Sequence, residues 1–144
     1  MIRTKRTASR SNTNRTSLRA RIRQMHRSLN QHQWEKCFQL IDPKLRAEGR
    51  VSFPAYAEGL HEFMQAFGAV RPWHVRINLY LDGSKNKRDP RPFAYVYVIW
   101  QDAEHDFHMF RDRWVKADGR WYTRVVGLVP NRPASSQDPV SAKR

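Results

Sequence analysis

The clearest pattern in the chain is a block of apolar and aromatic residues between positions 93 and 129. Residues 93–101 are dense in β-branched and aromatic types, which favour a pleated, half-buried strand. Two similar runs, 105–116 and 120–129, flank Ala117-Asp118-Gly119, a predicted three-residue turn in which Gly119 takes a positive φ. The pattern predicts three consecutive antiparallel strands.

A further strand is predicted at residues 73–81, where apolar and polar side chains alternate. Its apolar positions point to one face and are Trp73, Val75, Ile77, Leu79 and Leu81. Strict alternation is typical of a strand with one buried face. The polar residues 82–92 predict a long loop between this strand and the next.

Three helices are predicted before the strands. The first begins at Thr16 or Ser17, either of which can cap it, and its apolar stripe is Leu18, Ile22, Met25 and Leu29. The second follows a break at residues 30–33, and its apolar side is Trp34, Cys37, Phe38, Ile41 and Leu45. The third covers residues 53–67 between the cap Ser52 and Gly68. We predict one α+β domain over residues 16–130, with three helices packed on a curved four-stranded antiparallel sheet.

The formal net charge of +14 is concentrated at the N-terminus. Residues 1–30 hold nine basic residues and no acid, and residues 1–15 have too little apolar surface to offset their ordering entropy. We predict a disordered basic arm at 1–15, whose candidates for binding polyanions are Arg3, Lys5, Arg6, Arg10 and Arg15. The alternatives are a solubilising tail or an organelle transit peptide. The polar residues 131–144 predict a second disordered segment.

Several classes of protein are excluded by what the sequence lacks. No apolar run is long enough to cross a membrane and no secretory leader is present, so we expect a cytoplasmic protein without membrane contact. The single cysteine, Cys37, excludes an internal disulfide, and its apolar setting predicts an inert thiol. No phosphate-binding loop, metal-binding helix or nucleophile elbow is present, so we predict no cofactor and no metal.

Three stretches of the chain resemble one known superfamily. They are residues 29–34 leading to Leu40-Ile41-Asp42-Pro43, the third helix ending at Gly68, and the closing hairpin at residues 113–122. Over residues 17–130 the chain resembles the nuclear-transport-factor-two-like superfamily, which includes SnoaL-like polyketide cyclases and ketosteroid isomerase. The resemblance implies a cone-shaped α+β fold with a pocket, and a dimer formed through the sheet. It does not fix the function, because members of this superfamily have many activities.

The strands also suggest a site. If Lys116 pairs with Arg120, one face of the sheet gathers the ligand-pocket candidates Trp100, His108, Asp112, Trp114, Tyr122 and Arg124. On this register Asp112 lies opposite Arg124, which predicts a cross-strand ion pair. His108 and Asp112 are then the catalytic candidates, since an imidazole and a carboxyl can move a proton. The alternative is a structural salt bridge beside a strand histidine.

Three functions follow from these patterns. The first is a small non-catalytic ligand-binding or scaffold domain, a homodimer that holds a small apolar or anionic ligand. The second is an isomerase or cyclase of the SnoaL-like type that uses an acid–base residue in its pocket. The third is a protein that binds nucleic acid weakly and without sequence preference through the basic arm.

Overall fold

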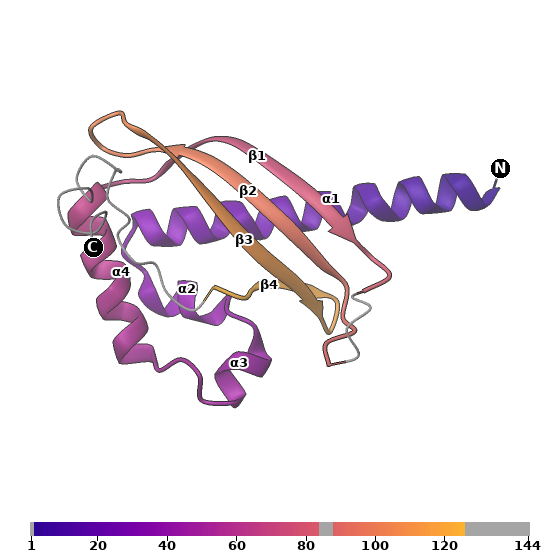
Figure 1. Cartoon of the computed structure of the whole chain (residues 1–144), viewed down its shortest axis with the longest axis horizontal. Helices are drawn as coiled ribbons and strands as arrows, with labels where there is room; N and C mark the ends of the chain where they lie inside the picture. The colour runs from indigo at the N-terminus through magenta and orange to yellow at the C-terminus, as the bar shows by residue number, and fades with distance from the viewer. Residues whose placement is uncertain (1, 84–87, 126–144) are drawn as a thin grey trace, which may run out of the picture.

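The computed structural model describes residues 2–83 and 88–125, and for residues 2–8 it describes the backbone alone. Its helices are α1 (Ile2–Asn30), α2 (Trp34–Gln39), α3 (Pro43–Ala47) and α4 (Phe53–Phe67). Its strands are β1 (Arg71–Tyr80), β2 (Phe93–Gln101), β3 (Phe107–Ala117) and β4 (Arg120–Thr123). The helices precede the strands, which form one antiparallel sheet in the order β1-β2-β3-β4 (Figure 1). The predicted α+β class and four-stranded antiparallel sheet are confirmed.

The hairpin between β3 and β4 differs from the prediction by one residue. Its turn has two residues, Asp118 at φ 51° and Gly119 at φ 78°, as a type I′ turn requires. Ala117 therefore pairs with Arg120, and Trp114 pairs with Thr123. A slip of one residue exchanges the two faces of a strand, so the predicted positions of the β4 side chains were wrong.

The other strand boundaries hold more closely. β2 spans the predicted residues, and Gln101 pairs with Phe107 rather than with His105, a shift of two residues that leaves each side chain on its predicted face. β4 ends at Thr123, whereas the sequence predicted a strand as far as residue 129. Arg124 and Val125 are therefore outside the strand, and residues 126–129 lie outside the described residues.

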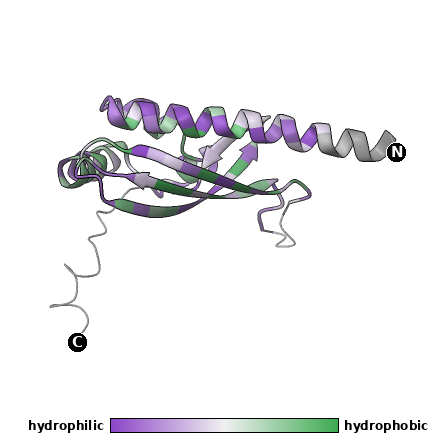
Figure 2. Ribbon diagram, turned by 90° about the horizontal axis from the view of Figure 1, so that it is seen from above, coloured by the Kyte–Doolittle hydropathy of each residue, from purple (hydrophilic) through white to green (hydrophobic). Residues whose placement is uncertain are grey.

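Helix α1 is longer than predicted, because it begins at Ile2 rather than near Thr16. It lies as a separate layer along one face of the sheet (Figure 2), and Leu18 and Ile22 bury the apolar stripe there. The predicted disorder of residues 1–15 is contradicted by the helical backbone over residues 2–15 and by the contacts of residues 10–15.

Those contacts are polar, which is why apolar periodicity did not reveal them. Arg15 Nη1 donates to the Ile77 carbonyl at 2.6 Å, and Arg10 and Arg19 donate to the carbonyls of Leu81 and Val75 at 3.4 Å. These carbonyls belong to β1 or directly follow it, and β1 is an edge strand with one unpaired side. The arginines of α1 thus cover a sheet edge that the sequence left open.

The predicted second helix is divided into α2 and α3. Ile41 forms an isolated bridge with Thr123 between them, and Asp42 caps α3 by accepting from the Lys44 amide at 3.1 Å. Pro43 fills the first turn of α3, where its missing N–H costs little. The chain therefore has four helices in its described residues rather than the predicted three.

The cap and the end of α4 agree with the sequence. Ser52 accepts from the Ala55 amide at 3.4 Å, and Gly68 ends the helix at φ 72°. The apolar side of α4 packs against the sheet through Phe63 and Phe67, whose rings lie 5.6 Å from that of Trp100.

No helix within the described residues is long and apolar enough to cross a membrane. The predicted tail at 131–144 lies outside the described residues.

Candidate functional site

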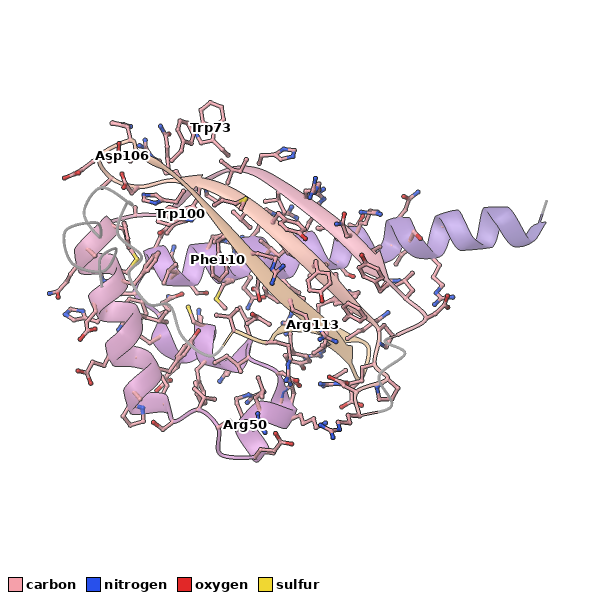
Figure 3. The ribbon with its side chains drawn as sticks, in the orientation of Figure 1. Arg50, Trp73, Trp100, Asp106, Phe110 and Arg113 are labelled. Carbon is pink, nitrogen blue, oxygen red and sulfur yellow. The ribbon has the colours of Figure 1, made fainter. Side chains whose placement is uncertain are left out.

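A cavity of about 80 Å³ lies between α1, α4 and the face of the sheet that packs on the helices. Its walls come from distant parts of the chain: α1 supplies Ile22, Met25, His26 and Leu29, α4 supplies Tyr56 and Phe63, and Val70 closes one side. The strands and the residues after β4 supply Val96, Val98, Trp100, Phe110, Asp112, Trp114, Thr123 and Val125. Trp100 and Phe110 stand on the neighbouring strands β2 and β3 (Figure 3). The cavity is therefore mostly apolar.

Asp112 is the acid in this wall. It is buried on β3, and the Thr123 hydroxyl donates to its two carboxyl oxygens, with distances of 2.9 and 2.8 Å. Within the described residues no Lys, Arg or His forms an ion pair with it. Burial raises the pKa of Asp112 to about 7, although the Thr123 hydrogen bonds act against that shift. Asp112 can therefore gain or lose a proton near neutral pH.

Tyr56 and His26 are two further polar groups at the cavity. Burial, with the charge of Asp112 adding to its effect, raises the pKa of Tyr56, so its hydroxyl stays protonated. Burial lowers the pKa of His26 to about 4, so its imidazole is neutral at physiological pH. The cavity thus holds a phenol, an imidazole and a carboxyl without an adjacent fixed positive charge among the described residues.

Arg124, the predicted partner of Asp112, binds a different carboxylate. Its Nη1 donates to Asp42 Oδ2 at 2.8 Å, and Arg91 donates to both oxygens of Asp42 at 2.8 Å. The predicted Asp112–Arg124 ion pair is wrong, because the two-residue turn places Thr123 opposite Trp114 and on the face of Asp112. Arg124 then follows the end of the strand and turns toward the start of α3.

The six ligand-pocket candidates divide into two groups. Trp100, Asp112 and Trp114 line the cavity. Tyr122 lies opposite Val115 on the other face of the sheet, with the Arg21 guanidinium 5.0 Å from its ring. Like Tyr122, Arg124 and His108 are absent from the cavity wall.

His108, the other catalytic candidate, belongs to a loop-stabilising cluster. Its Nε2 lies 2.8 Å from Asp102 Oδ2, and its ring stacks on Trp100 at 4.5 Å. Asp102 Oδ1 accepts from the amides of Glu104 and Asp106, which fixes the turn before β3. Burial acts to raise the pKa of Asp102, but the hydrogen bond from His108 and those amides lower it overall. This cluster closes a hairpin and does not face the cavity.

The candidates for polyanion binding are only partly described. Arg10 and Arg15 donate to carbonyls at the β1 edge, while the side chains of Arg3, Lys5 and Arg6 lie outside the described residues. Cys37 is buried, and burial raises the pKa of its thiol to about 12, as expected for an unreactive cysteine.

Sequence reasoning missed His26, Tyr56 and Thr123 as cavity residues. Periodicity could have found His26, which follows Ile22 by one helical turn, and Tyr56, which precedes Leu60 by one turn. Thr123 depended on the turn length, and Asp-Gly is the dipeptide that a two-residue turn prefers.

Comparison of the chain with models of protein families, with curated proteins and with solved structures finds no match. Among the described residues, no group of three or more His, Cys, Asp or Glu side chains could hold a metal ion. The function must therefore be argued from the cavity itself.

Proposed function

We propose that this chain is a small-molecule-binding domain of the nuclear-transport-factor-two-like type, whose cavity accepts an apolar group bearing one polar atom. The observation that carries this proposal is Asp112, a buried carboxyl without a cationic partner in the described residues, on the wall of an apolar cavity. A buried acid of this kind is costly to the fold, and such groups are concentrated at functional sites. A ligand with a hydrogen-bonding atom would give Asp112 the partner that the protein does not supply.

The size of the cavity limits the ligand. Its volume of about 80 Å³ is smaller than the ~150 Å³ cavity that accommodates benzene in a protein core. The cavity therefore takes a compact molecule of few heavy atoms, or the end of a longer one. Its apolar walls favour hydrocarbon, and Tyr56 and Asp112 favour a carbonyl or hydroxyl oxygen.

Binding is tested with acetone, a ketone of few heavy atoms, titrated into the full chain and followed by methyl NMR. We expect shifts in the methyl signals of Ile22, Val96 and Val98. Val98→Phe fills the cavity and abolishes these shifts, whereas Ile99→Phe places the same ring on the opposite face of β2 and leaves them unchanged. Equal responses of both variants, or no shifts in the unmodified chain, would refute the proposal.

The pKa of Asp112 favours a second candidate function, proton transfer to a bound carbonyl compound. A general base works best when its pKa is near the working pH, and the Tyr56 hydroxyl can donate to a developing oxyanion. This is the isomerase-type chemistry that the family resemblance implies. In heavy water, acetone should then gain deuterium beside its carbonyl, faster as pH rises through about 7. Asp112→Asn should abolish the effect; an unchanged rate would leave binding as the only function.

A further inference from the structure

The face of the sheet that points away from α1 is a second unoccupied surface, which we call the outer face. In the described strands it includes Trp73, His74, Arg76, Asn78, Tyr80, Phe93, Tyr95, Tyr97, Ile99, Gln101, Phe107, Met109, Arg111 and Arg113. None of the described helices covers it, since α1 packs on the opposite side (Figure 2). The cavity and Asp112 lie on that opposite side too, so the outer face is independent of the proposed ligand site.

Large apolar side chains are unusually exposed on the outer face. Trp73 is 64% exposed, Phe107 is 56% and Met109 is 70%, and the rings of Trp73 and Phe107 lie 5.4 Å apart. Trp73 projects from the edge of the sheet, far from Arg113 on β3 (Figure 3). A contiguous exposed patch of this kind marks an interaction surface.

The charges of the outer face all have one sign. Arg76, Arg111 and Arg113 stand on it beside His74, and none of its described residues is Asp or Glu. A partner that neutralises this face must supply negative charge.

The arginines lie directly over aromatic rings. Arg76, Tyr97 and Arg111 form one row across β1, β2 and β3. The Arg76 guanidinium lies 4.7 Å from the centre of the Tyr97 ring, and Arg113 lies 4.3 Å from that of Phe93. The arginines of β1 and β3 therefore flank the aromatic side chains of β2, which follow one another at every second residue, roughly 6.6 Å apart.

We propose that the outer face binds single-stranded nucleic acid, with phosphates on the arginines and unstacked bases on the aromatic rings. Exposed rings on a sheet together with a basic surface are the two features that hold single strands without base-specific hydrogen bonds. Duplex bases are already stacked on each other, so this face favours a single strand over a duplex. The surface differs from the N-terminal arm of the sequence hypothesis, which offers charge but no aromatic ring.

A second copy of the chain is the competing occupant, as the sequence resemblance implies. A two-fold contact through this face would bring Arg76, Arg111 and Arg113 of both copies together, and the described outer face has no carboxylate to separate them. Like charges brought together at an interface oppose association. The charge therefore favours a polyanion over a second copy.

The test is fluorescence anisotropy of the full chain with labelled single-stranded DNA and RNA of about 15 nucleotides, a length within or above known site sizes. Phe107→Leu keeps an apolar side chain but removes an exposed ring, and should weaken binding roughly 5- to 150-fold, as expected for losing one base stack. Phe107→Tyr should restore the affinity. Arg76→Gln with Arg111→Gln should make the salt slope shallower by about 1.4, or ~0.7 for each lost phosphate contact.

A matched control uses two exposed arginines of α1, on the opposite layer. Arg23→Gln with Arg27→Gln removes the same charge but leaves the outer face unchanged. If this control weakens binding as much as the outer-face pair, the attraction is only a matter of net charge and the proposal fails. It also fails if sedimentation shows a dimer that Phe107→Leu dissociates while neither state binds the oligonucleotides. Asp112→Asn should leave binding unchanged, which separates this outcome from that of the cavity proposal.

Discussion

Asp42 and Asp112 are both buried, yet the protein treats them in opposite ways. Asp42 is fully buried at the start of α3 and accepts hydrogen bonds from Arg91, from Arg124 and from the Lys44 amide. Burial acts to raise its pKa, but these donors hold that pKa at about 2. Asp112 is 8% exposed and has the Thr123 hydroxyl, and burial raises its pKa to about 7. Both acids are buried, yet Asp42 is the far stronger one.

The difference shows how strongly cationic partners change what a buried carboxyl does. Two guanidiniums keep Asp42 ionised and let it join α3, the loop before β2 and the segment after β4. Asp112 faces a cavity instead of a cation, and so its charge is poorly compensated. We regard Asp42 as structural and Asp112 as the group available for a ligand or a proton.

The largest effect is expected from Asp42→Asn, which leaves Arg91 and Arg124 without their shared carboxylate. Breaking a buried ion pair from one side costs roughly 3–5 kcal/mol, and Asn still caps α3. Urea unfolding at neutral pH measures the loss. Asp89→Asn is the control, since this partly exposed acid forms its ion pair with Arg91 and should cost less than about 1 kcal/mol. Similar losses in both variants would show that Asp42 is not the centre of this cluster.

The two acids should also give stability opposite dependences on pH. The folded-state pKa of Asp42 is depressed, so its contribution is present above about pH 4 and is lost as pH falls toward 2. The folded-state pKa of Asp112 is raised, so stability is highest below its unfolded value of 3.8 and falls as pH rises through about 7.

Asp112→Asn should remove the fall in stability with rising pH that Asp112 causes. At pH 8 the variant should be more stable than the parent by roughly 2–4 kcal/mol, since the full shift corresponds to about 4 kcal/mol. At pH 4 the two proteins should have nearly equal stability. Urea midpoints at both pH values, with an NMR titration of the Asp112 carboxyl, provide the measurement. A variant that is destabilised equally at both pH values would mean that Asp112 is ionised and satisfied in the folded protein.

The strand register is tested by the coupling of Arg124 to each acid. A double-mutant cycle of Arg124→Gln with Asp42→Asn should give an interaction energy of about 1–2 kcal/mol, because the two side chains share a hydrogen bond. The same cycle with Asp112→Asn should give less than about 0.5 kcal/mol. The reverse result would restore the three-residue turn and the ion pair predicted from the sequence.

The sequence predicted most of the fold, because its main signals are local. Alternation along residues 73–81 and the apolar density of residues 93–101 suffice to place two strands, and Ser52 and Gly68 mark the two ends of α4. The start of α1 escaped prediction because residues 10–15 are tied to the β1 edge by the side chains of Arg10 and Arg15 rather than by an apolar stripe. A contact between residues so distant in the chain has no periodic signature.

The site was predicted less well than the fold, for a related reason. Trp100, Asp112 and Trp114 could be placed on one face by alternation alone, and they do line the cavity. Predicting the partner of Asp112 required the correct register across the β3–β4 turn. An error of one residue in that register gave Arg124 as the predicted partner, whereas the structure has Thr123. The Asp42 cluster joins three segments that only the folded chain brings together.

The smallest effect is expected at Thr123, whose hydroxyl is the side-chain donor that meets both Asp112 oxygens. Thr123→Val keeps the shape but removes this donor, which should raise the pKa of Asp112 further and cost about 1–2 kcal/mol at pH 8. At pH 5 the cost should be smaller, because Asp112 is then protonated in the folded state. Thr123→Ser is the control, since it retains the hydroxyl and should leave that pKa nearly unchanged. If Thr123→Val left the titration of Asp112 where it was, the hydroxyl would not be what holds this acid in its cavity, and the contrast with Asp42 would rest on burial alone.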